Sequence, residues 1–69
     1  MPSSVIRTWT YDEAARRLTI TFVSGDVYAY LAVPPMEAEG FKADRSKGRF
    51  FAERIRDRFA FERVHIATP

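Results

Sequence analysis

Three stretches in the first half of the chain have the residue pattern of β-strands. They are residues 5–11, 17–23 and 27–33. The middle stretch alternates most clearly, with Leu18, Ile20 and Phe22 on one side and mostly threonine on the other. Such a period of two is typical of a strand with one buried face. Because only short polar turns separate the stretches, we predict a three-stranded antiparallel β-meander.

A short helix is expected directly after the third strand. Pro34 and Pro35 end that strand, because neither residue can donate a hydrogen bond to a β-ladder. Proline is, however, well suited to the first turn of a helix. We therefore predict a helix over residues 36–43, with Met36 and Phe41 available for the core.

A second helix is predicted from Ser46, a suitable N-cap residue, to about Arg58. On a helical wheel its apolar residues share an arc of roughly 100°, the width of a core-facing stripe. These residues are Gly48, Phe51, Ala52, Ile55 and Phe59. Residues 59–64 are expected to pack back onto the sheet. The complete pattern predicts an α+β fold in which two short helices cover one face of the meander (β-β-β-α-α).

The chain has 69 residues, so we expect a single domain over residues 1–69, with a core over about 3–64 and a tail over 65–69. It contains no cysteine and one histidine, His65. This composition excludes disulfides, a thiolate metal cage and the usual histidine-based zinc sites within this chain. We expect no metal site, no cofactor and no enzymatic activity, since no constellation of catalytic residues is present.

Neither a signal peptide nor an apolar run of the ~20 residues needed to span a bilayer is visible in the sequence. A cytoplasmic protein without membrane contact is therefore expected.

Charge is distributed unevenly between the two halves of the chain. Residues 1–41 carry three basic and five acidic side chains, whereas residues 42–69 carry eight basic and four acidic ones. Six of the eight are arginines, whose guanidinium groups suit bidentate contacts with phosphate. This asymmetry suggests a partner that carries negative charge.

Six basic residues in and around the second predicted helix could form a phosphate-binding surface. They are Arg45, Lys47, Arg49, Arg54, Arg56 and Arg58. The alternative is a solvated helix face, supported by ordinary pairs with Glu53 at helical spacing.

Two tyrosines extend the binding hypothesis to the predicted sheet. Tyr28 and Tyr30 lie two residues apart on the third strand and therefore point to the same face. Exposed aromatic rings on a sheet can stack with the bases of single-stranded nucleic acid. The alternative is a structural role, with each tyrosine packed against neighbouring strands.

A succession of short motifs runs from about Ser3 to Val64. It comprises Ser3-Ser4, Tyr11-Asp12, Tyr28-Ala29-Tyr30, Val33-Pro34, Ser46-Lys47-Gly48, Phe50-Phe51, Ile55-Arg56 and Phe59-Ala60-Phe61. In order and spacing this succession resembles the KTSC domain, a small domain also found at the C-terminus of some lysyl-tRNA synthetases. The chain departs from the family pattern at Ala52, where asparagine is expected, and at phenylalanines 50, 59 and 61, where tyrosine is commoner.

The resemblance implies a bacterial domain without established activity, for which RNA binding has been suggested. Together with the charge pattern, it leads to the hypothesis of a monomeric, non-enzymatic accessory module that binds RNA or another nucleic acid. The alternative hypothesis is a protein-interaction module that docks on a larger partner through the free face of the sheet, which contains Thr19, Thr21 and Val23.

Overall fold

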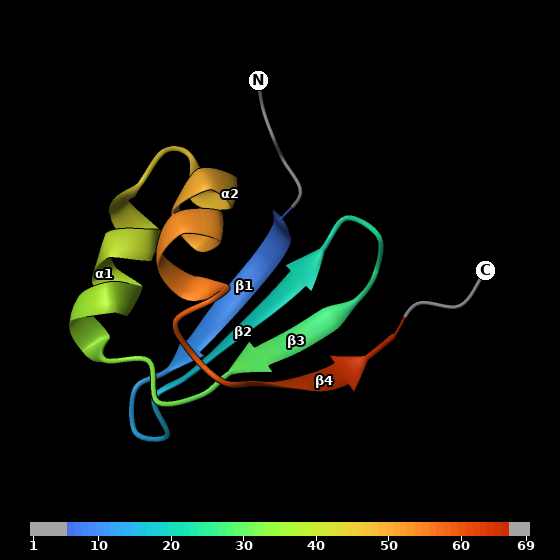
Figure 1. Cartoon of the computed structure of the whole chain (residues 1–69), viewed down its shortest axis with the longest axis horizontal. Helices are drawn as coiled ribbons and strands as arrows, with labels where there is room; N and C mark the ends of the chain where they lie inside the picture. Colours follow the sequence, from blue (N-terminus) through green and yellow to red (C-terminus); the bar gives the residue numbers. More distant parts are fainter. Residues whose placement is uncertain (1–5, 67–69) are drawn as a thin grey trace.

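The computed structural model describes residues 6–66, which form an antiparallel sheet and a helical layer on one of its faces (Figure 1). The elements are β1 (Ile6–Asp12), β2 (Arg17–Phe22), β3 (Val27–Tyr30), α1 (Pro35–Ala43), α2 (Lys47–Phe50), η1 (Phe51–Ile55) and β4 (Phe61–His65). The strand order is β1-β2-β3-β4. The α+β fold and the antiparallel sheet covered by helices are confirmed. The expectations for residues 3–5 and 67–69 lie outside the described residues.

The sheet has four strands in the described residues, so the prediction of a three-stranded meander is wrong in this respect. The chain was expected to return to the sheet after the second helix, and it does so as a full strand, β4, paired antiparallel with β3. Tyr30 lies opposite Phe61, and Tyr28 lies opposite Arg63. Because every residue of β4 is exposed, its sequence shows no alternation of apolar and polar residues. Backbone pairing with β3 defines this strand, so the pattern of apolar and polar residues could not predict it.

The third strand ends at Tyr30, three residues earlier than predicted. Ala32 has a φ of 57°, a left-handed conformation that is incompatible with an extended strand. Val33 is nevertheless fully buried. Its N–H donates to the carbonyl of Arg16 at 2.9 Å, and its own carbonyl accepts a 2.6 Å hydrogen bond from the Tyr11 hydroxyl. These bonds replace the strand ladder at the point where the chain turns toward α1.

Helix α1 places Phe41 and Ala38 in the core, whereas Met36 is 81% exposed. The prediction for Phe41 is confirmed and that for Met36 is wrong. At about 100° per residue, Met36 and Phe41 are about 140° apart around the helix, so one buried face cannot contain both. Ala38 and Phe41, three residues apart, do share a face. The Phe41 ring packs edge-on against Trp9 of β1 at 5.1 Å between ring centroids.

The second helix is shorter and wider than predicted. Ser46 precedes it as expected, but the Ser46 hydroxyl makes no capping hydrogen bond. The four α-helical residues of α2 are followed by the π-helix η1, where the Arg56 N–H donates to the Phe51 carbonyl at 2.8 Å, five residues back. Regular helix ends at Ile55, so Arg56 and Arg58 lie in the turn that follows. Phe51 and Ile55 are buried as predicted.

The core lies between the helices and one face of the sheet. It is formed by Leu18, Ile20, Tyr30, Val33, Phe41, Phe51 and Ile55. On the opposite face, Arg17 of β2 forms a 3.3 Å ion pair with Glu62 of β4. Glu62 lies opposite Ala29 of β3, which is buried between these two strands. No helix in the described residues is long and apolar enough to cross a membrane.

Candidate nucleic-acid interface

The two tyrosines expected to form a stacking platform face the helices. Register pairs Leu18 with Tyr30 and Ile20 with Tyr28, and residues that lie opposite each other point to the same face. Tyr30 is 2% exposed, and its ring packs edge-on against Phe51 at 5.4 Å. The structural alternative holds for Tyr30, and the prediction that its ring offers a binding surface is wrong.

Tyr28 is half-buried, and its ring is already stacked within the protein. The ring of Phe61 on β4 lies nearly parallel to it, with 5.3 Å between centroids and 12° between planes. Phe61 is 45% exposed. The aromatic surface that remains accessible therefore includes Phe61, which the sequence analysis did not select. Phe61 could have been selected only from its position opposite Tyr30 in the sheet, and that position is known only once β4 is known.

The Tyr30 hydroxyl lies in a protected environment beside the turn that follows η1. Burial raises the pKa of Tyr30 from 10.0 to about 12. The neighbouring Tyr28 adds to this rise, the positive charge of Arg56 opposes it, and the negative charge of Asp57 adds a smaller increase. Arg56, one of the predicted binding residues, is thus close enough to Tyr30 for its charge to act on the tyrosine hydroxyl.

We expect the stability of the protein to fall as the pH rises from 10 toward 12. In this range the unfolded chain has released the Tyr30 proton, whereas the folded chain keeps it because the pKa of the folded state is higher. Urea unfolding below pH 10 and near pH 12 measures this loss. The Tyr30→Phe variant, compared with the wild type, should show a shallower dependence on pH. Equal slopes for the two proteins would contradict the protected environment of Tyr30.

Several of the six basic residues have partners within the protein. Lys47 Nζ donates to the backbone carbonyls of Lys42 at 3.1 Å and Asp44 at 3.0 Å, and so closes the C-terminal end of α1. Arg49 Nε lies 3.3 Å from Glu53 Oε2. The Arg49–Glu53 ion pair is at the surface, where such pairs contribute at most about 1 kcal/mol. Lys47 therefore has a structural role, whereas Arg49 retains its two terminal nitrogens for other contacts.

The other four basic residues are more accessible. The Arg54 guanidinium lies over the ring of Phe50, 5.5 Å from its centroid, and Arg56 is 4.0 Å from Asp57. Arg45 and Arg58 are exposed and form no ion pair with any residue that the structure describes. We call residues 45–58 the basic segment. It contains six basic and two acidic side chains, a net charge of +4, and it forms the part of the helical layer that lies beside α1 (Figure 1).

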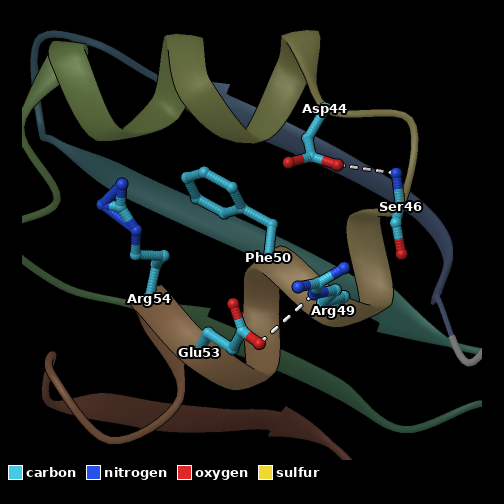
Figure 2. A pocket seen from close by; sticks show the side chains of 6 residues that line it. All are labelled: Asp44, Ser46, Arg49, Phe50, Glu53 and Arg54. Atoms are coloured by element: carbon cyan, nitrogen blue, oxygen red, sulfur yellow. Dashed lines mark hydrogen bonds and ion pairs between the residues drawn. The ribbon is translucent and has the colours of Figure 1, made fainter.

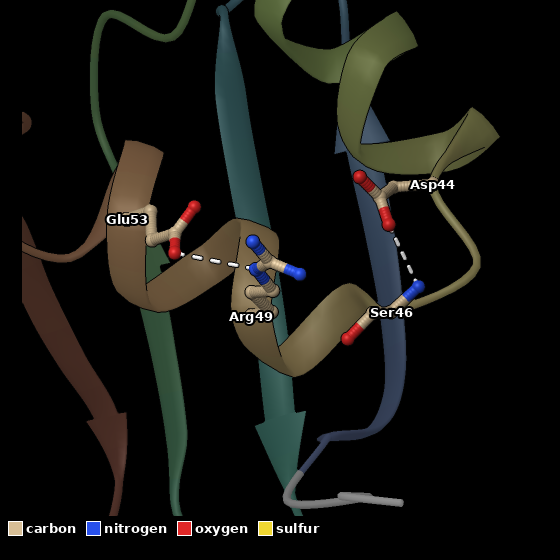
Figure 3. Close-up of polar contacts among 4 residues, drawn as sticks. All are labelled: Asp44, Ser46, Arg49 and Glu53. Carbon is tan, nitrogen blue, oxygen red and sulfur yellow. Dashed lines mark hydrogen bonds and ion pairs between the residues drawn. The ribbon is translucent and has the colours of Figure 1, made fainter.

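A polar hollow of about 260 Å³ lies where the basic segment meets the end of α1 (Figure 2). Its lining residues are Asp44, Ser46, Arg49, Phe50, Glu53 and Arg54. The Asp44 carboxylate accepts a 2.7 Å hydrogen bond from the Ser46 N–H and fixes the loop between the helices (Figure 3). Two predicted binding residues, Arg49 and Arg54, therefore share one site. Among the described residues, no group of three or more acidic, histidine or cysteine side chains could hold a metal ion.

Comparisons with known proteins agree with the fold and with the motif succession. The family model described as the KTSC domain matches residues 2–59. Lysine–tRNA ligases from Nostoc punctiforme and Trichormus variabilis are 41% and 34% identical over 61 residues, 88% of this chain. The chain spans only 11% of the length of these curated relatives. The crystal structure of a KTSC domain protein from Yersinia pestis superposes with a TM-score of 0.86 at 35% identity, covering 94% of this chain and 92% of that one.

Proposed function

The chain belongs to the KTSC domain family, and from this premise we propose that it is a non-enzymatic accessory module that binds RNA through the basic segment. The observation that carries the proposal is the concentration of six basic and only two acidic side chains in fourteen consecutive residues, with all five of the arginines among them exposed. Arg45 and Arg58 in particular are not paired with carboxylates in the described residues. Exposed, unpaired guanidinium groups can bind phosphate without first losing a contact within the protein.

The relatives support RNA as the nucleic acid. A lysine–tRNA ligase acts on tRNA by its name, and a segment 41% identical to this chain makes up 11% of its length. A small basic domain attached to such an enzyme is well suited to increase the affinity for RNA by adding a second point of attachment. We extend this role to the present chain. In it, arginine side chains hold the phosphates, and the exposed Phe61 ring, which is stacked on Tyr28, offers an aromatic surface to the bases.

Titration of fluorescently labelled single-stranded RNA with the protein, followed by anisotropy at several salt concentrations, tests this proposal. Each phosphate contacted should add about −0.7 to the slope of log affinity against log salt. Three contacts would thus give a slope of about −2. Absence of binding at low salt, or binding that does not depend on salt, would rule out the proposed role of the basic segment.

A protein-interaction module is the second candidate function. It is favoured by Val23, which is 61% exposed in the turn after β2, and by the occurrence of a homologous segment within a much longer ligase chain. For this function Val23→Asp should abolish partner binding, whereas substitution of Arg45 and Arg58 should leave it unchanged. The opposite pattern supports binding of RNA.

A further inference from the structure

The hollow between α1 and the basic segment has an aromatic wall. The Phe50 ring is half-buried and packs edge-on against Phe41 at 6.0 Å. An ideal β-carbon at Gly40 would lie only 3.0 Å from Cζ of Phe50, so the lack of a side chain at Gly40 leaves room for the ring where it is. Figure 2 shows Phe50 between Arg54 on one side and Arg49 on the other. A flat group that enters the hollow therefore meets an aromatic ring and a guanidinium group, both of which stack with bases.

The polar groups around the hollow are balanced in charge. Two arginines, Arg49 and Arg54, face two carboxylates, Asp44 and Glu53. Among the residues that the structure describes, each carboxylate has one partner, so its second oxygen is available: Glu53 Oε2 pairs with Arg49 Nε, and Asp44 Oδ1 accepts from the Ser46 N–H (Figure 3). This balance disfavours a bare phosphate as the occupant, because each carboxylate would repel it. It favours a neutral ligand with both donors and acceptors.

The paired side chains of Arg49 and Glu53 present donors and acceptors next to each other. Guanine has the matching arrangement, with the acceptors O6 and N7 on one edge and the N1–H and N2–H donors on the adjacent edge. Arginine binds O6 and N7 in a bidentate manner. A carboxylate can accept from N1–H and N2–H in the same way. Adenine lacks both pairs, because its N6 is a donor and its N1 carries no hydrogen, and neither pyrimidine has both pairs.

The size of the hollow limits the ligand. Its volume of about 260 Å³ is below the range of roughly 300–1,000 Å³ typical of pockets that enclose a drug-sized ligand. A ligand group of the size of one base is therefore the kind of occupant to which this hollow is suited. Arg45, between two lining residues in sequence, is exposed there to meet a phosphate.

We propose that this hollow is a binding site for one unpaired guanine base, read by Arg49 and Glu53 and stacked against Phe50 and Arg54. The inference rests on the proposed RNA-binding function and adds a base preference to it. Guanine can come from a free nucleotide or from a single-stranded RNA.

The test compares labelled oligouridine strands that contain one central guanine or one central adenine, with GMP and AMP as free nucleotides. We expect the guanine strand to bind about tenfold more tightly than the adenine strand. If the free nucleotide is the ligand, GMP should bind more tightly than AMP by the same factor, with no RNA strand present. If RNA is the ligand, GMP alone binds weakly and the preference appears in the strand.

Glu53→Gln is the decisive variant, and Asp57→Asn is its matched control. Both remove one negative charge from the basic segment, but only Glu53 lines the hollow. On electrostatic grounds both should bind RNA slightly more tightly. Only Glu53→Gln should lose the preference for guanine. Circular dichroism of each variant establishes that the fold is retained.

The possible failures can be told apart. Equal binding of guanine and adenine by the wild type, in strands and free nucleotides alike, overturns the guanine site, and RNA binding by the basic segment stands. A preference that Glu53→Gln retains overturns the assignment to this hollow. Absence of binding to either strand at low salt overturns the proposed function itself.

Discussion

The Phe41→Ala variant is expected to lose a large part of its free energy of unfolding. Phe41 is fully buried between the sheet and the helices, with Trp9 at 5.1 Å and Phe50 at 6.0 Å between ring centroids. Truncation of a buried phenylalanine to alanine costs about 3–5 kcal/mol. A domain of this length has a free energy of unfolding of roughly 3–10 kcal/mol, so the loss removes a large part of it. Urea unfolding, followed by circular dichroism and Trp9 fluorescence, measures the change.

Met36→Ala is the matched control on the same helix. Met36 is highly exposed, so its truncation should change the free energy of unfolding by no more than about 0.5 kcal/mol. Phe41→Leu keeps much of the buried volume and should fall between the two, which gives a measurable value even if Phe41→Ala is unfolded. Equal stability of Phe41→Ala and Met36→Ala would contradict the packing of α1 on the sheet.

Replacement of both Arg45 and Arg58 by glutamine is expected to weaken binding to single-stranded RNA by roughly thirtyfold. Each lost charged contact should cost about 1 kcal/mol, and 1.4 kcal/mol corresponds to a factor of ten in affinity. The salt dependence should decrease as well, with the slope about 1.4 closer to zero for two lost phosphates. Neither residue lines the hollow at Phe50, so the expected loss comes from phosphate contacts and should be the same for guanine and adenine strands.

The control for this pair is Arg7→Gln combined with Arg16→Gln. It removes the same charge from exposed positions on β1 and in the turn before β2. If the basic segment is the interface, the control should retain most of the RNA affinity. An equal loss in the two double variants would indicate a response to net charge alone and would contradict a defined site.

The elements that periodicity predicts well are those with one buried face. Leu18 and Ile20 alternate with threonine on β2 and are fully buried, and Phe51 and Ile55 lie four residues apart on the buried side of the second helix. Burial of these residues depends on local spacing, which the sequence displays directly. The family resemblance is confirmed by the family model and by the solved structure from Yersinia pestis.

Other features depend on contacts between distant segments and have no local pattern. Every residue of β4 is exposed, and the strand is formed by backbone pairing with β3, which lies thirty residues or more away in sequence. The burial of Tyr30 follows from which face of the sheet the helices cover, and alternation along one strand cannot decide this. The π-helical turn at η1 departs from the regular spacing assumed for the predicted helix, because its backbone hydrogen bonds span five residues in place of four.

Mapping of amide chemical shifts in labelled protein, with a short single-stranded RNA added at low salt, tests the RNA interface most directly. We predict that shifts concentrate in residues 45–58 and near Phe61, and that they diminish as salt is raised. Shifts on the opposite face of the sheet, at Thr8, Thr10, Thr19 and Thr21, with none in residues 45–58, would contradict the proposed interface. So would a spectrum that RNA leaves unchanged.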